Sequence, residues 1–367
     1  MIARLLLRLL VPLALSAVLG ACTQKNTADQ DQGSQGGTAG VAIGLDRFLL
    51  FPNPVGLDPL ALDGGTFETN TNAYAAAYYR AIDPTAAKDT IDKWKTANLF
   101  GTTGNGTEHL AVFRDVKDLG YGRRMTGRRN TDGSVAFYVE NYNVAPGGSA
   151  QYSSDLNVDA AIRRDTQWHV GTNAIEWSGA TCIAGVDPAD CDSTVKFAKY
   201  YNFSSADGTR QLAVDLDGKG LKAMPGPCIT CHGGRGDPLT PVDISGNPRF
   251  PLVENSLSRK RGDVEAKLHG MNVDSFSYST TQANFAKSDL QPFLKDFNQW
   301  ILCTYPTPAA ATVTGAWGTC NRPIAGQNEW QGTAGPMIEA WYGGPGMPQA
   351  TFQDTYVPSG WTANASL

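Results

Sequence analysis

Short runs of apolar and aromatic residues, separated by turn-forming residues, dominate the first half of this chain. Their length and their content of β-branched and aromatic side chains are typical of β-strands. The predicted strands lie at residues 110–113, 135–139, 168–177, 195–203 and 212–216. Asp132-Gly133 and Asp207-Gly208 each fall between two such runs and predict hairpin turns. One helix is also predicted, opened by Asp83-Pro84 and carrying Ile91 and Trp94 on its apolar side.

The spacing of apolar residues changes to that of helices after residue 221. Ser288-Asp289 predicts the start of a helix that runs to about Leu302. Its apolar positions are Leu290, Phe293, Leu294, Phe297, Trp300 and Ile301. Residues 329–341 form a second candidate helix, and residues 256–267 are a helix-like stretch. The pattern therefore predicts an α+β chain: a β-rich domain with hairpins over residues 44–220, followed by a mainly helical, loop-rich domain over residues 221–367.

Residues 1–21 have the composition of a secretory signal peptide. Arg4 and Arg8 give a basic start, and a short apolar run from Leu9 to Leu19 follows. The run is too short to span a bilayer comfortably. Leu19-Gly20-Ala21-Cys22 resembles the processing site of bacterial lipoproteins, which implies that Cys22 becomes the N-terminus and carries a lipid. The alternative is an ordinary signal peptide with an incidental cysteine.

The residues after the cleavage site predict a flexible tether. Residues 22–43 are mostly polar or glycine and have no apolar period. In bacterial lipoproteins, a residue other than aspartate after the lipidated cysteine favours sorting to the outer membrane, and Thr23 stands there. We therefore expect a lipid-anchored protein of the bacterial cell envelope, held at the outer membrane and facing the periplasm or the cell surface.

Composition narrows the possible partners. The hydrophobic fraction is 41% and the charged fraction is 18%, which is typical of a globular chain with a real core. A net charge of -5 argues against nucleic acid as a partner.

The strongest chemical signal is the run Cys228-Ile229-Thr230-Cys231-His232, the attachment motif for a c-type haem. Each thiol adds to one vinyl group of the haem, and two intervening residues let both sulfurs reach the same edge of the macrocycle. The next side chain, His232, is then placed beneath the iron as an axial ligand. Gly233 and Gly234 are expected to let the backbone pass close to the porphyrin.

Three other readings of the cysteine pair remain open from the sequence. The pair could be half of a zinc site, but no second pair follows at the usual spacing. It could be a thioredoxin-type redox pair, but no βαβ pattern surrounds it. It could also be a plain disulfide. The predicted export favours the haem, because haem attachment of this type takes place outside the cytoplasm.

The cysteines outside the haem motif are expected to carry a lipid or to form disulfide bonds. The chain has seven cysteines, of which lipid takes Cys22 and haem takes two. The other four lie in two local pairs, and an even remainder in an exported chain predicts disulfides. We expect Cys182–Cys191 and Cys303–Cys320, although four cysteines allow three pairings. On the chain-entropy argument the second bond is worth about 3 kcal/mol.

Longer stretches resemble a family of large bacterial proteins that are described only as containing a cytochrome c domain. The similar stretches are residues 113–115 with 121–126, 135–141, 171–176, 215–218 and 231–235. The resemblance covers most of residues 44–361 and implies a monohaem c-type cytochrome, with roles carried over only for Cys228, Cys231 and His232. It supplies no substrate. The chain departs from small cytochromes c because a large region precedes the haem motif.

Basic residues supply candidate partners for the haem propionates. Arg235, three residues beyond His232, is the nearest in sequence. A basic run at Arg123, Arg124, Arg128 and Arg129 is interpreted as a solvated loop, with propionate or partner binding as the alternative.

The sixth iron ligand has three candidates. Met271 is the first choice, because a lone haem in an electron carrier usually pairs histidine with methionine, as the resemblance implies. His269 lies two residues away, and Met347 precedes a proline in a glycine-rich loop. If residues 269–271 are extended, both His269 and Met271 point to one face, whereas on a helix only one can face the haem.

The sequence thus predicts an envelope electron carrier with one covalent haem c and redox proteins as partners. No nucleophile or acid–base signature is visible, which fits that function. Two alternatives remain: a haem enzyme, peroxidase-like or a small-molecule oxidase, with an open distal site, and a haem-containing sensor or binding lipoprotein.

Overall fold

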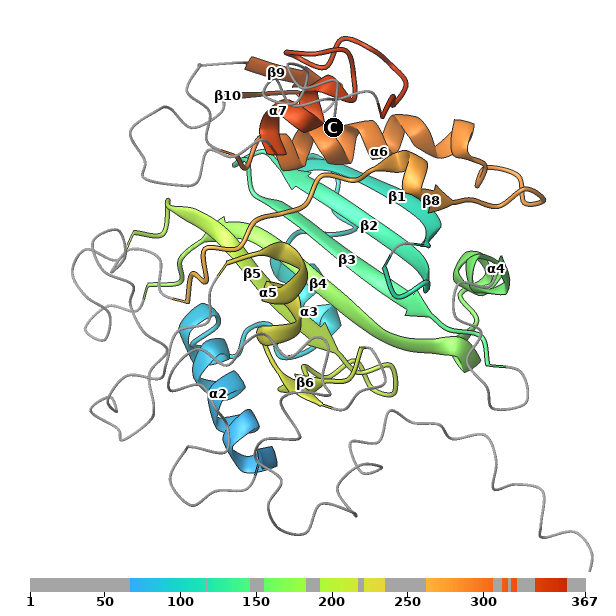
Figure 1. Ribbon diagram of the computed structural model, residues 1–367. Helices are drawn as coiled ribbons and strands as arrows, with labels where there is room; N and C mark the ends of the chain where they lie inside the picture. Colours follow the sequence, from blue (N-terminus) through green and yellow to red (C-terminus); the bar gives the residue numbers. More distant parts are fainter. Residues whose placement is uncertain are drawn as a thin grey trace, which may run out of the picture.

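The computed structural model describes residues 67–116, 118–145, 155–182, 192–216, 221–234, 262–305, 312–315, 318–321 and 334–354. Its centre is a sheet of six antiparallel strands in the order β5-β4-β3-β2-β1-β8, with helices packed around it (Figure 1). The strands are β1 Gly106–Asp115, β2 Gly122–Asn130, β3 Val135–Tyr142, β4 His169–Gly179, β5 Lys196–Phe203 and β8 Phe276–Ser277. The predicted α+β class is confirmed.

The two predicted hairpin turns have different outcomes. Asp132-Gly133 joins β2 to β3, with Gly133 at φ 79° and the Asp132 carboxylate accepting from the Ser134 amide. After Asp207-Gly208 the chain also turns back, and Arg210 forms a bridge to Phe203. However, the next strand, β6 (Ala213–Val214), pairs with β7 (Lys222–Ala223) instead of β5. The second predicted hairpin is therefore wrong beyond its turn.

The basic run predicted as a solvated loop is strand β2. It pairs along its length with β1 and β3. The loop prediction fails because the arginines find polar partners inside the fold. Arg128 is only 1% exposed and donates to Asn130, to Thr102 and to Glu108.

Helix α6 (Lys287–Leu302) covers one face of the sheet (Figure 1). Phe297 packs edge-to-face on Phe137 of β3, and Trp300 stacks on the ring of His109 of β1. Gly127 leaves room for this contact, because a Cβ there would lie 2.5 Å from both Phe137 and Phe297. The predicted helix is confirmed, and the Asp289 carboxylate caps it by accepting from the Ala286 amide.

Helices α2 (Phe67–Ile82) and α3 (Ile91–Ala97) contribute to the other face and to the β5 edge. Trp94 of α3 is fully buried and packs against Tyr138 and Tyr201 of the sheet. The predicted helix start at Asp83-Pro84 is wrong, because α2 ends at Ile82 and Thr90 caps α3. Asp83 instead accepts from the amides of Ala87 and Lys88 and forms an ion pair with Arg210.

Helix α4 (Asp155–Arg163) packs at one end of the sheet. Its Ala160 and Ala161 form a small buried cluster with Val112 and Tyr142. A Cβ at Gly122 would lie 1.7 Å from the Asn157 carbonyl oxygen, so this contact requires glycine.

The part of the chain after residue 221 contributes α5 (Gly226–His232) and α7 (Ala334–Ala340). The helix-like stretch predicted at 256–267 is not helical in its described part, since residues 263–272 contain no helix. One hydrophobic core includes residues from both sides of the 220/221 boundary, and β8 joins the sheet of the first half. None of the helices in the described ranges combines the length and the apolar character that crossing a bilayer requires.

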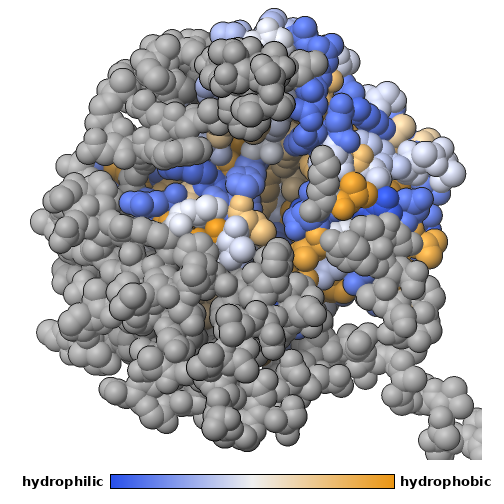
Figure 2. All heavy atoms as spheres, in the orientation of Figure 1, coloured by the Kyte–Doolittle hydropathy of each residue, from blue (hydrophilic) through white to orange (hydrophobic). Residues whose placement is uncertain are grey.

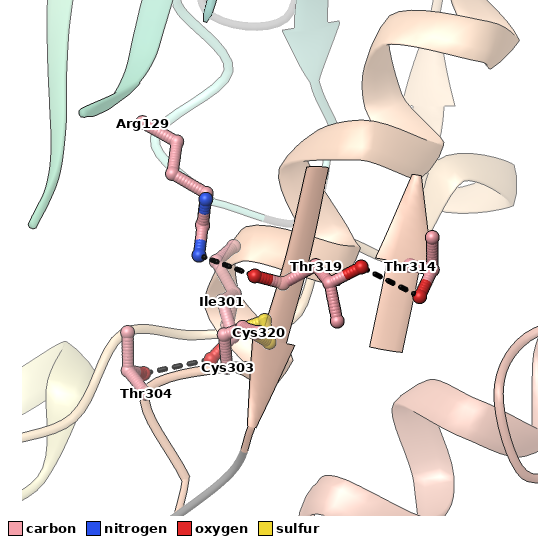
Figure 3. The surroundings of a disulfide bond; sticks show 7 residues. All are labelled: Arg129, Ile301, Cys303, Thr304, Thr314, Thr319 and Cys320. Carbon is pink, nitrogen blue, oxygen red and sulfur yellow. Dashed lines mark hydrogen bonds between the residues drawn. A yellow bond between two sulfur atoms is a disulfide. The ribbon is translucent and has the colours of Figure 1, made fainter. Parts of the chain in front are cut away.

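The predicted disulfide Cys303–Cys320 is present, with 6.1 Å between the two Cα atoms. It joins the end of α6 to the hairpin of β9 (Thr312–Gly315) and β10 (Gly318–Asn321) (Figure 3). Arg129 of β2 donates to the Thr319 carbonyl of the same hairpin. Cys182 is also disulfide-bonded, and its predicted partner Cys191 lies outside the described residues.

A buried ion network ties the loop before α3 to strands β4 and β5. Glu176 has no exposed side-chain surface and accepts from Lys88 Nζ at 2.5 Å and Asn98 Nδ2 at 2.8 Å. Lys199 Nζ, 1% exposed, lies 3.6 Å from the same carboxylate. Burial opposes ionisation of Glu176, but the charges of Lys88 and Lys199 outweigh it and lower its pKa to about 2.

We expect Glu176→Gln to lower the free energy of unfolding by about 3 kcal/mol or more, because it leaves a buried lysine charge unpaired. Chemical denaturation at neutral pH measures this. Since the native pKa lies below the ordinary value of 4.5, the stability that Glu176 contributes is complete above that pH and is lost as the pH falls towards 2. The difference between parent and variant should therefore shrink over this window.

Asp89→Asn is the matched control, because Asp89 forms an exposed i,i+4 pair with Lys93. Exposed pairs of this kind contribute little, so its denaturation curve should follow that of the parent protein. Equal destabilisation by the two substitutions would contradict the role given to the buried network.

Candidate haem-attachment site

The cysteine motif forms the short helix α5, which lies in front of β4 and β5 in Figure 1. Pro227 stands in its first turn, where a missing amide hydrogen costs nothing, and Gly233 ends it at φ 69°. Cys228 and Cys231 are three residues apart on this helix, so their side chains share one side of it. Both thiols are free, Cys228 partly buried and Cys231 exposed. The plain disulfide considered for this pair is therefore absent from the structure.

His232, the last residue of α5, is held by a backbone carbonyl. Its Nδ1 lies 3.0 Å from the Lys267 oxygen, which can only accept, so Nδ1 carries the proton. The other ring nitrogen, Nε2, is then the one with a free lone pair, as in metal-ligating histidines oriented by a carbonyl. Burial and the neighbouring His269 lower the pKa of His232 to about 4, which keeps the ring in the neutral form that ligates metals.

The segment after His232 packs against residues 264–266. Gly234 has φ 101°, and a Cβ there would lie 2.3 Å from the Val264 carbonyl oxygen. A Cβ at Gly233 would meet nothing within 4 Å. At Gly234 the absence of a Cβ thus permits close contact with the protein's own backbone.

The thiols do not have the properties of a redox-active pair. Burial raises the pKa of Cys228, and burial together with the charge of Asp118 raises that of Cys231. Thiol–disulfide catalysts instead depend on a lowered cysteine pKa, because the thiolate is the nucleophile. The environment of α5 thus disfavours the thioredoxin-type reading.

A charged pair lies beside the motif. Arg123 of β2 donates to Asp118 at 2.5 Å, and its other terminal nitrogen lies 3.9 Å from Asp115. The charge of Asp118 raises the pKa of Cys231 and contributes a raising effect at His232, and the charge of Arg123 acts on both in the opposite direction. The sequence pattern had indicated that Arg123 and the neighbouring arginines belong to a solvated loop. Arg235, the other basic candidate, and Cys22, the lipidation candidate, lie outside the described residues.

His269 packs directly on the ring of His232, with 4.8 Å between the ring centroids and a tilt of 42°. A metal–imidazole bond is about 2 Å long, so two rings on opposite sides of one iron have centroids roughly 6 Å apart. The observed contact leaves no space for iron between the rings. This arrangement favours His269 as a neighbour of the proximal ligand over His269 as the sixth ligand.

The two methionine candidates occupy different environments. Asn298 of α6 fixes the backbone of Met271 on both sides, accepting from its amide at 2.7 Å and donating to its carbonyl at 3.0 Å. Met271 is partly buried, and residues 269–271 form neither a helix nor a strand. Met347 is 1% exposed within the hydrophobic core.

The sheet offers apolar surface on the face to which Tyr200 and His232 belong. Met125, Val139 and Ile175, on the middle strands, point to this face and remain only partly buried. Figure 2 shows hydrophobic and hydrophilic residues side by side where the described residues are visible from this side. Free thiols, an oriented neutral imidazole and partly buried apolar side chains on the sheet fit a covalently attached haem.

Sequence reasoning missed Tyr200, Asp118 and Lys267 as residues of this site. Lys267 acts through its backbone carbonyl, which carries no side-chain signal.

Comparison with protein-family models, curated proteins and solved structures finds no match.

We expect Gly234→Ala to displace His232 from the Lys267 carbonyl, because the added Cβ meets the backbone of Val264 and strains a left-handed residue. The free energy of unfolding should fall by about 1–3 kcal/mol or more, measured by chemical denaturation. Gly226→Ala is the control within the same helix, since a Cβ there meets nothing within 4 Å. A tolerated Gly234→Ala would contradict the packing described here.

Proposed function

We propose that this chain is an exported monohaem c-type cytochrome that carries single electrons through a covalently bound haem. The observation that supports this most is the combination of two free thiols on α5 with His232, whose Nδ1 is held by the Lys267 carbonyl. This combination provides covalent attachment and a correctly oriented axial nitrogen from one seven-residue helix. The cytochrome c-like character expected of residues 221–367 belongs to this proposal.

In this proposal, the two cysteines, His232 and the sheet have different roles. Each thiol of Cys228 and Cys231 adds across one vinyl group: a sulfur–carbon bond forms, and the thiol hydrogen goes to the other vinyl carbon. The addition needs no oxidant. His232 would present Nε2 to the iron, and the apolar side chains Met125, Val139 and Ile175 on the sheet would help to exclude water from the haem. The bound haem supplies one-electron transfer, one electron arriving from a donor and one leaving to an acceptor.

The proposal includes the envelope location. The lipid anchor at Cys22 and the tether of residues 22–43 would hold the globular part near the outer membrane. Redox proteins of the envelope are the expected partners.

A haem enzyme with an open distal site is the second candidate. The observation in its favour is that the charges of Arg123 and Asp118 act on His232, because peroxide chemistry needs charged groups near the iron. Against it, Arg123 is already engaged by Asp118 and Asp115. Carbon monoxide distinguishes the electron carrier from the enzyme. A six-coordinate iron does not bind carbon monoxide, whereas an iron with an open site does.

We expect the chain, produced in an envelope with haem-attachment machinery, to keep its haem after denaturation and acid–acetone extraction. The peptide containing Cys228 and Cys231 should carry the mass of one haem, and His232→Ala should alter the iron spectrum. Cys228→Ser with Cys231→Ser should abolish the colour of the denatured chain. Cys303→Ser with Cys320→Ser is the control and should keep it. Free extraction of haem from the parent protein would end the proposal.

We further propose Met271 as the sixth ligand, because Asn298 fixes its backbone and the contact of His269 with His232 disfavours the histidine. Met271→Ala should then remove the long-wavelength sulfur-to-iron charge-transfer band of the ferric protein. Met347→Ala should keep the band. If the parent protein has no such band, methionine ligation is wrong, and an open site with the enzyme function becomes the better account.

A further inference from the structure

The carbonyl oxygen of Lys267 accepts from two side chains. His232 Nδ1 donates to it at 3.0 Å, and the hydroxyl of Tyr200 donates to it at the longer distance of 3.4 Å. A carbonyl oxygen has two lone pairs and can serve both donors. The two rings also pack against each other, with centroids 5.3 Å apart. The phenol and the imidazole therefore share one acceptor.

Tyr200 is held rigidly in this position. It lies in β5, is 2% exposed, and its amide donates to the Tyr78 hydroxyl at 2.9 Å. Side chains alternate along a strand, so Tyr200 faces His232 while Tyr201 points to the opposite face and stacks on Tyr79. A buried phenol needs an acceptor, and among the described residues the Lys267 carbonyl is the acceptor that it contacts.

We propose that Tyr200 is a positioning residue that sets the ligand strength of His232 through the shared Lys267 carbonyl. Donation from Nδ1 makes an imidazole more electron-rich and favours the ferric state of an iron that it ligates. A second donor on the same oxygen weakens that donation. Tyr200 therefore raises the reduction potential, a role that rests on the haem proposed above.

Tyr200→Phe tests the inference, because it removes one oxygen and keeps the ring against His232. The midpoint potential of the haem-loaded protein should shift downwards. The Nδ1–H proton of His232, followed by NMR, should exchange with solvent more slowly, as its hydrogen bond becomes stronger. A merely structural role would change stability without moving these two quantities together.

Tyr201→Phe is the matched control on the same strand. Its hydroxyl has no hydrogen-bond partner among the described residues and lies on the other face, so the potential should stay at the parent value. If Tyr200→Phe fails to fold, replacement of Tyr200 by a fluorinated tyrosine is the second variant. Its more acidic hydroxyl is a stronger donor and should shift the potential upwards.

The outcomes separate the two proposals. A parent protein without covalent haem ends the proposed function, and the role of Tyr200 falls with it. A parent protein with covalent haem, whose potential is the same with tyrosine, phenylalanine or fluorotyrosine at position 200, overturns the role of Tyr200 alone.

Discussion

The hydrogen bond between His232 Nδ1 and the Lys267 carbonyl joins two segments that are 35 residues apart in the chain. It fixes which ring nitrogen is free, because the carbonyl can only accept. Gly234 reinforces it, since only a residue without a Cβ lets the chain after α5 lie against Val264. The orientation of the candidate ligand thus depends on backbone contacts, and the non-helical segment 263–272 is as necessary to the site as α5 itself.

The sheet supports this arrangement, and its interior contains charged side chains as well as apolar ones. Glu176 and Lys199 are both buried and lie 3.6 Å apart; Glu176 also accepts from the Asn98 amide, and Lys199 donates to the Gly179 carbonyl. Removing one member would leave the other without its partner, so the network specifies a single pairing of β4 with β5. Tyr200 lies on the opposite side of β5 from Lys199, and a fixed β5 is what keeps its hydroxyl on the Lys267 carbonyl.

The sequence predicted those features that depend on local residue types. The turn at Asp132-Gly133, the helix with Leu290 and Phe297 on its apolar side, and the Cys303–Cys320 bond all follow from neighbours in the chain. Features decided by distant contacts were missed. Strand β2 was misread because Arg128 has partners in other segments, and Lys267 was invisible because it contributes only its backbone.

The same geometry bears on the choice between electron carrier and catalyst. A haem catalyst needs polar groups that can change partners or protonation on the open side of the iron. Here the nearby polar groups are already committed: Arg123 to two aspartates, and His269 to the ring of His232. An electron carrier needs the reverse, a ligand environment that stays the same while one charge is gained or lost. A neutral, half-buried imidazole fixed by a backbone carbonyl meets that requirement, so the arrangement around α5 favours electron transfer.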